Sequence, residues 1–107
     1  MTFFIKQNDT SPALQATLKD GSGAVINLTG CSVNFHMREV GSSEVKTDAS
    51  VNISDALNGV VYYQWAPADT DTIGSFEAEF EVTYTGGEVE SFPNNRFVEI
   101  EITDDIT

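Results

Sequence analysis

Basic residues are scarce in this chain of 107 residues. Five lysines and arginines stand against 17 aspartates and glutamates, which gives a formal net charge of −12. Affinity for a polyphosphate comes mainly from clustered Lys and Arg. Here the cations are scattered singly, at Lys6, Lys19, Arg38, Lys46 and Arg96. The composition therefore argues against nucleic acid as a partner, and against an anionic membrane surface for the same reason.

Long apolar runs are also missing. No stretch approaches the ~20 consecutive apolar residues that span a bilayer. The first nine residues lack the basic start and the apolar run of a secretory signal. The single cysteine, Cys31, cannot close an intramolecular disulfide, so the fold must depend on its apolar core. We expect a soluble protein made in a cytosol, with residues 1–107 forming a single domain.

Helical periodicity is nowhere sustained, and apolar residues recur at every second position instead. The clearest run is Phe76, Ala78, Phe80, Val82 and Tyr84, which alternates with polar residues. Such alternation is typical of a strand with one buried face and one wet face. The pattern predicts strands at 31–38, 76–84 and 98–102, with weaker candidates at 3–7, 14–18, 24–28, 51–53, 60–65 and 88–92.

Turn residues separate these runs. Asn58-Gly59 predicts a hairpin, and the segment 84–88, which contains Gly86-Gly87, predicts a second. Closely spaced strands without a crossover helix predict an all-β fold. We expect an antiparallel two-sheet β-sandwich of the immunoglobulin-like type, with a small barrel as the alternative. Residues 67–72 could form a single helical turn, but a connection between the sheets is favoured there.

Few residues are suited to catalysis. His36 is the only imidazole and is expected on the solvent face of its strand, where a surface or interface role is favoured. Cys31 is interpreted as a small core residue. A carboxylate pair for glycoside cleavage would need a cleft, whereas the glutamates project from an open sheet. We therefore predict no enzyme, and we assign no catalytic or cofactor-binding residue.

Metal binding is a weaker prediction. One cysteine and one histidine cannot build a structural zinc site. Calcium is more credible because Asp69 and Asp71, or Asp104 and Asp105, supply oxygen ligands, although the spacing of a calcium-binding loop is absent. Calcium stays an open alternative, and no metal ligand is assigned.

Two stripes of glutamate alternate with the apolar residues: Glu77, Glu79 and Glu81 in one predicted strand, Glu99 and Glu101 in another. If these strands pair, like charges lie opposite one another and lower stability unless something offsets them. A solvated face is the simpler interpretation. We also treat the five glutamates as a candidate docking face for a basic partner surface.

An apolar segment, Phe3, Phe4 and Ile5, lies ahead of the first turn. It could complete the chain's own sheet, or it could reach a neighbouring subunit as an N-terminal assembly arm. The first interpretation is favoured.

A series of short segments follows in a recognisable order: IKQNDTSP at 5–12, LKDG at 18–21, NLTG at 27–30, VNFHMR at 33–38, DALNGVVYYQW at 55–65, DTIGSFEAEF at 71–80 and SFP at 91–93. In this order and spacing, which cover nearly the full length, the chain resembles the N-terminal domain family of phage baseplate upper proteins. The resemblance implies a β-sandwich that serves as a structural part of a virion, usually as a symmetric oligomer around the tail. It brings no catalytic residues.

The resemblance implies that the chain acts in the virion, after synthesis in the host cytoplasm. Its expected partners are other virion proteins of the tail, baseplate, fibre or capsid. Larger baseplate proteins continue into further domains, so the role could be that of a tail adaptor, a fibre-attachment domain or a capsid decoration protein. The alternative from another class is a carbohydrate- or surface-binding module, in which Trp65, Tyr62, Tyr63 or Phe92 would stack on a sugar ring.

Overall fold

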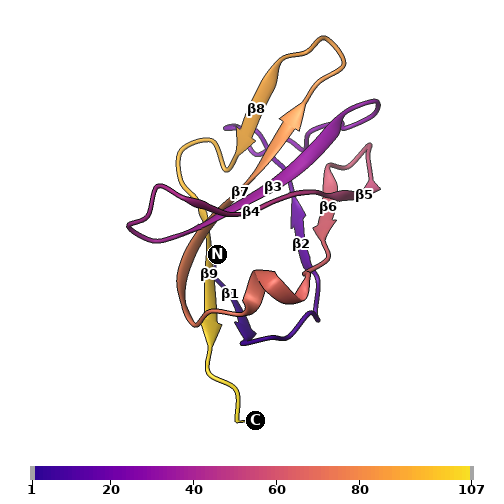
Figure 1. Cartoon of the computed structure of the whole chain (residues 1–107). Helices are drawn as coiled ribbons and strands as arrows, with labels where there is room; N and C mark the ends of the chain where they lie inside the picture. Colours follow the sequence, from indigo (N-terminus) through magenta and orange to yellow (C-terminus); the bar gives the residue numbers. More distant parts are fainter. Residues whose placement is uncertain (1, 107) are drawn as a thin grey trace.

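Alternating apolar residues place β7 (Gly74–Thr83) and β3 (Ser32–Glu39) at the centre of the larger of two sheets. The computed structural model describes residues 2–106, and Figure 1 shows both sheets. The larger sheet has the strand order β1-β9-β7-β3-β4, and β8 pairs with the part of β7 that β9 does not cover. Its other strands are β1 (Thr2–Lys6), β4 (Val45–Ser50), β8 (Val89–Phe92) and β9 (Val98–Thr103).

The smaller sheet has the order β2-β6-β5. It consists of β2 (Leu14–Thr17), β5 (Asn52–Asp55) and β6 (Val60–Tyr63). Leu14, Val61 and Tyr63 are buried and belong to the same core cluster as the inward side chains of the larger sheet. The two packed layers confirm the predicted all-β sandwich. The three strongest strand predictions match β3, β7 and β9, with boundaries that differ by no more than about two residues.

Phe35 lies at the centre of an aromatic cluster that joins the two sheets. Its ring stacks on Tyr63 of the smaller sheet, with 4.4 Å between the ring centroids. On the larger sheet it packs against Phe80 at 5.4 Å. Trp65, just after β6, meets Phe35 edge-on and stacks on Phe3. Aromatic pairs of this kind stabilise a core by about 0.5–1.5 kcal/mol each beyond the area they bury.

One strand pair departs from the predicted antiparallel arrangement. β1 runs parallel to β9, with Ile5 beside Ile102, while the other strand pairs of the described residues are antiparallel. The expectation of a purely antiparallel sandwich is therefore wrong for this pair. Alternation decides which side chains face the core, and it is the same for either strand direction. The pattern could not reveal the direction.

Both predicted hairpins are confirmed: one joins β5 to β6 and the other joins β7 to β8. Gly59 shows why the first turn needs glycine. Its φ is +69°, and a Cβ there would lie 2.7 Å from the carbonyl oxygen of Ile26. A side chain would therefore meet both backbone strain and a clash with the neighbouring loop.

The predicted strand at 24–28 is wrong. Its backbone makes one isolated bridge, between Val25 and Lys19. The two hydrogen bonds of this bridge run from Ile26 N–H to the Leu18 carbonyl and from Asp20 N–H to the Ala24 carbonyl. Leu28 N–H donates to the Ala56 carbonyl instead, so no continuous ladder forms. Leu28 is nevertheless fully buried. The alternation here reflects contact with the core and not strand pairing.

The sequence pattern does not predict β4, because its inward-facing positions are not strongly apolar. The buried residue at its centre is Thr47, and Ala49 is half-buried. The Thr47 hydroxyl donates a hydrogen bond to Asp69, which satisfies it inside the protein. A polar residue at a core position removes the alternation on which strand prediction depends.

Residues 67–72 form both of the structures considered for them. η1 (Pro67–Thr70) is a single 3-10 turn with proline at its start, and it connects β6 of the smaller sheet to β7 of the larger one. The N-terminal segment completes the chain's own sheet, as favoured, because β1 pairs with β9 along its length.

Two neighbouring residues of β1 provide a matched test of this packing. Ile5 is 4% exposed and belongs to the core, whereas Phe4 is 67% exposed on the outer face. We expect Ile5→Ala to lower the free energy of unfolding by about 2–4 kcal/mol, because it removes buried methyl groups and leaves a cavity. Phe4→Ala should change it by less than about 0.5 kcal/mol. Urea denaturation of both variants measures the difference, and equal losses would contradict the burial of β1.

Candidate functional site

The outer face of β7 carries Glu77, Glu79 and Glu81. All three are half-buried, because β7 has neighbouring strands on both sides. The register places Glu77 directly opposite Glu99 of β9. The two predicted glutamate stripes therefore lie side by side, and Glu77 and Glu99 are like charges on adjacent strands.

Hydroxyl groups from neighbouring strands bind the glutamates of β9. The Thr2 hydroxyl donates to Glu99 at 2.9 Å. The Ser75 hydroxyl lies 2.8 Å from one carboxylate oxygen of Glu101 and 2.9 Å from the other. These contacts orient the β9 carboxylates on the outer face.

A cation on β3, Arg38, offsets part of the charge of β7. The Arg38 guanidinium pairs with Glu77 at 2.8 Å, and its carbon lies 5.2 Å from the centroid of the Phe97 ring. His36 lies between two carboxylates, 3.3 Å from Asp48 and 3.5 Å from Glu79. From the sequence, a basic partner was the expected source of this compensation. The structure supplies part of it from within the chain, because β3 pairs with β7 along its whole length.

A hollow of about 430 Å³ opens on this face, and we call it the acidic hollow. It is lined by carboxylates, by apolar side chains and by Arg38 and His36. Three acidic residues, Asp48, Glu77 and Glu79, meet there, and Val45 and Phe97 form apolar walls. The hollow therefore combines negative charge with surface that packs well against aliphatic groups.

His36, Glu79 and Glu81 form the one group among residues 2–106 whose potential metal-ligating atoms lie within 4.8 Å of one another. The sequence pattern does not reveal this group, because only the pairing of β3 with β7 brings His36 to the glutamates. Both ring nitrogens of His36 already face carboxylates of the chain, Asp48 and Glu79. The arrangement is that of a cross-strand ion-pair network.

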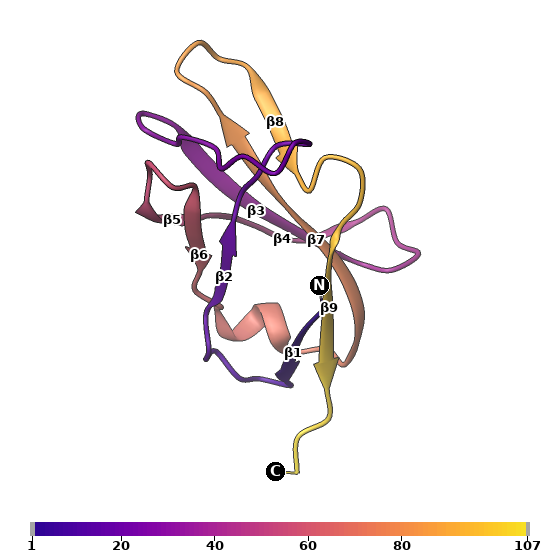
Figure 2. The ribbon, with the colours of Figure 1, turned by 180° about the vertical axis from the view of Figure 1, so that it is seen from behind.

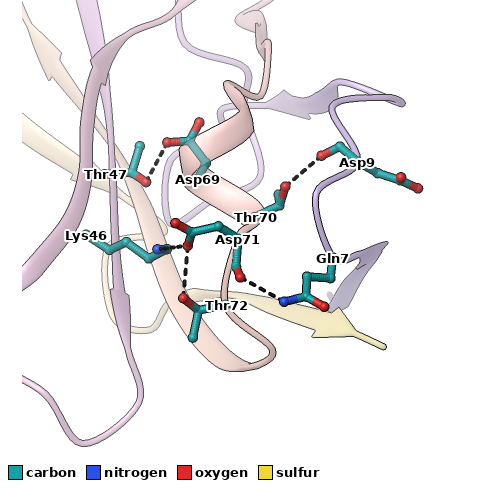
Figure 3. Close-up of polar contacts among 8 residues, drawn as sticks. All are labelled: Gln7, Asp9, Lys46, Thr47, Asp69, Thr70, Asp71 and Thr72. Atoms are coloured by element: carbon teal, nitrogen blue, oxygen red, sulfur yellow. Dashed lines mark hydrogen bonds and ion pairs between the residues drawn. The ribbon is translucent and has the colours of Figure 1, made fainter. Parts of the chain in front are cut away.

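Asp69 and Asp71, one of the two aspartate pairs considered for calcium, make separate contacts (Figure 3). Asp69 is buried and accepts hydrogen bonds from the Thr47 and Tyr63 hydroxyls and from the Ala66 N–H. Asp71 pairs with Lys46 at 2.7 Å. The hydrogen bond from Lys46, followed by the one from Thr72, lowers the pKa of the Asp71 carboxyl. Each carboxylate is directed to its own partners, and the two do not converge on one site.

Further hydrogen bonds hold η1 and the residues after it against the N-terminal loop (Figure 3). The Thr70 hydroxyl donates to the Asp9 carbonyl, and the Gln7 amide donates to the Asp71 carbonyl. Burial, followed by the hydrogen bond to Asp69, raises the pKa of Tyr63 well above its ordinary value. This cluster is structural, because its polar groups bind one another across η1, β4 and the N-terminal loop.

The aromatic residues considered for sugar stacking are mostly inside the protein. Trp65, Tyr63 and Phe92 are buried in the core, and Tyr62 is half-buried. The flat exposed aromatic patch that stacking would need is absent at these four positions. Cys31 is half-buried and packs against the core, in line with its interpretation as a small core residue.

The three residues of the candidate N-terminal arm have different surroundings. Ile5 is in the core, and Phe3 is half-buried against Trp65. Phe4 points outward and pairs in register with Glu101 of β9. Only Phe4 is therefore well placed to contact a neighbour, and it borders the glutamates of β9.

The sequence and the fold both match known proteins. The sequence profile described as "BppU N-terminal domain" matches residues 3–106. The chain belongs to the BppU N-terminal domain family. This is a domain of phage baseplate proteins, so membership supports a structural role in a virion and confirms the resemblance noted in the sequence.

A solved structure has the same fold as this BppU N-terminal domain. The N-terminal domain of phage TP901-1 ORF48 matches with a TM-score of 0.72 and 22% sequence identity, over 96% of this chain and 85% of that one. A search of curated proteins finds no match. Within residues 2–106 no helix has the length and apolar character needed to cross a bilayer.

The ion pair between Arg38 and Glu77 leads to a salt-dependent prediction. Arg38→Gln leaves Glu77 facing Glu99 without its cation, so we expect the free energy of unfolding to fall by about 0.5–1 kcal/mol at low salt. The loss should shrink in about 0.5 M NaCl, where exposed charges are screened. Arg96→Gln is the control, because no ion pair of Arg96 is found within residues 2–106. Denaturation at both salt concentrations tests this, and a loss independent of salt would contradict it.

The raised pKa values of two tyrosines predict that the protein loses folding stability in alkali. Burial, and then the hydrogen bond to Glu90, raises the pKa of Tyr84 to about 12, and the pKa of Tyr63 is raised as well. An unfolded tyrosine loses its proton near pH ~10, so the stabilisation is complete below that pH and disappears as the pH rises toward 12. We expect the urea midpoint to fall across this interval. Tyr84→Phe should flatten the decline, and a midpoint that stays constant between pH ~10 and ~12 would contradict the prediction.

Proposed function

We propose that this chain is a structural adaptor of a tailed phage, with residues 1–107 acting as one unit without catalysis. It joins other virion proteins of the baseplate or tail, or attaches a fibre. The observation that carries the proposal is the family match over residues 3–106. The core supports it, because the cluster of buried residues is apolar and both sheets contribute to it, which makes a stiff connecting part.

The contact with a basic neighbour is proposed at Glu77, Glu79, Glu81, Glu99 and Glu101, the candidate docking face. The acidic hollow lies at one end of this face, bounded by Phe97 and Val45. An arginine or lysine side chain would place its charge against Glu79 and Asp48 and its aliphatic stem against the apolar walls. Because Arg38 pairs with only one of the five glutamates, Glu77, the face keeps an excess of negative charge.

A second part of the contact is proposed at Phe4. This exposed ring borders Glu101 on the outer face, so it extends the docking face with an apolar surface. Phe3 and Ile5 support the strand from the inner side. The proposed assembly arm is thus reduced to one outward-facing residue on an ordered strand.

In the particle we propose a symmetric homo-oligomer, assembled from chains made in the host cytoplasm. Closed symmetry suits a component arranged around a tail. Neither nucleic acid nor membrane is a proposed partner, in keeping with the large excess of acidic residues.

The test measures incorporation into virions of the phage or prophage that encodes the chain. Particles assembled with the wild-type chain should contain it at a fixed copy number after purification, as measured by quantitative mass spectrometry. The variant Glu79→Gln/Glu81→Gln/Glu99→Gln should be incorporated at least about fivefold less, because it removes three charges from the docking face. The control, Glu39→Gln/Glu44→Gln/Glu88→Gln, removes three exposed charges elsewhere and should be incorporated normally.

The outcomes separate the two parts of the proposal. Absence of the wild-type chain from purified particles overturns the virion role. Equal incorporation of both triple variants overturns the docking face and leaves the virion role in place. Circular dichroism of the purified chains checks that each variant folds.

A further inference from the structure

A second hollow, of about 350 Å³, lies between the edge strand β2 and the segment that joins β8 to β9. Figure 2 shows these two boundaries from behind. Its lining includes Gln15, Thr17, Lys19, Phe92, Arg96 and Val98, and we call this site the basic groove. Phe92 and Val98 are buried and form its apolar base.

The charge of the basic groove is opposite to that of the rest of the molecule. No aspartate or glutamate lines it, although the chain has 17 of them, whereas Lys19 and Arg96 both do. Neither cation takes part in any ion pair found within the described residues. Two of the five lysines and arginines thus lie unpaired at one groove. An acidic ligand fits this charge.

The backbone of β2 is open on the side of the groove. β2 is an edge strand, and within residues 2–106 it pairs only with β6. The Leu18 N–H donates to the Gly59 carbonyl on the β6 side. Since backbone groups alternate in an antiparallel ladder, those of Gln15 and Thr17 point to the free edge. An extended segment could therefore add to this edge through main-chain hydrogen bonds.

The end of the chain has the complementary chemistry. Residues 103–106 read Thr-Asp-Asp-Ile, and we call them the tail. The segment after β9 extends away from both sheets in two opposite views (Figures 1 and 2). Ile106 is 93% exposed, the highest value among the exposed large hydrophobic residues of the described chain. Two carboxylates beside an exposed isoleucine match an apolar groove with two unpaired cations.

A tail cannot reach the groove of its own chain. β9 begins at Val98, which lines the groove, and it ends at Thr103, where the tail begins. Five steps along a strand span about 17 Å, and the tail continues away from the body (Figure 1). The groove and the tail therefore lie at opposite ends of β9, so a contact between them must join two copies.

We propose that the tail of one copy docks in the basic groove of a second copy, beside β2, with Asp104 and Asp105 near Lys19 and Arg96 and with Ile106 on the apolar base. This contact deepens the proposed assembly role and rests on it. The contact is heterologous, because each copy contributes its tail to one contact and its groove to a different one. Repetition of such a contact closes a ring or extends a filament.

The test uses the full chain in analytical ultracentrifugation. The wild type should self-associate in a concentration-dependent manner at low salt and dissociate in about 0.5 M NaCl. The groove variant Lys19→Glu/Arg96→Glu and the tail variant Asp104→Lys/Asp105→Lys should each weaken association by more than about tenfold, because like charges then meet. An equimolar mixture of the two variants should associate again, because the basic tail now meets an acidic groove.

A matched control and a residue-level readout complete the test. Glu44→Lys/Glu88→Lys makes the same change of net charge as the tail variant, at exposed positions outside the groove lining, and should associate at least as well as the wild type. In ¹⁵N-HSQC spectra recorded on dilution, the amides of Gln15, Thr17 and Lys19 should shift. A wild type that stays monomeric to about 1 mM at low salt, a mixture that does not associate, or shifts confined to another surface would each overturn the proposal.

The two proposals fail separately. A chain that is absent from particles but associates through tail and groove overturns the virion role and retains this contact. A chain that is present in particles, and whose mixed variants do not recover association, overturns this contact alone.

Discussion

The pairing of β7 along both of its edges is the constraint on which the rest of the structure depends. With β3 on one side and β9 and β8 on the other, its backbone is satisfied and its alternate side chains must divide between two faces. Phe76, Phe80 and Val82 enter the core, where Phe80 packs against Phe35. The glutamates between them are forced onto the outer face. One strand thus builds the hydrophobic core and the acidic surface together.

Charge on this protein is sorted by surface. The acidic hollow forms where β7 meets β3 and β4, and the one charge of Arg38 offsets only part of the negative charge there. The basic groove forms beside β2, where no carboxylate lines the surface. The two hollows adjoin at Phe97, which lines both. Neighbouring surfaces of opposite charge favour ordered contacts with other proteins. That arrangement suits a structural member of a baseplate domain family.

Polar groups inside the protein serve its architecture. Asp69 gathers Thr47, Tyr63 and Ala66 around η1, at the point where the chain passes from the smaller to the larger sheet. Buried polar groups that satisfy one another hold elements in a single arrangement. The same network accounts for β4, whose central residue is a threonine directed at Asp69. Asp69, one of the aspartates considered for calcium, therefore acts in packing.

The amino-acid sequence by itself determined the layers of this protein. The alternation of apolar and polar residues at 76–84 predicted the strands of a sandwich, because burial on one face is a local requirement. Asn58-Gly59 predicted a hairpin, because positive φ at a turn is local as well. Only the tertiary structure decided that β1 runs parallel to β9, that Arg38 faces Glu77 and that Lys19 joins Arg96 at one groove. These features depend on which distant strands become neighbours, and a local pattern is the same whichever neighbour a strand acquires.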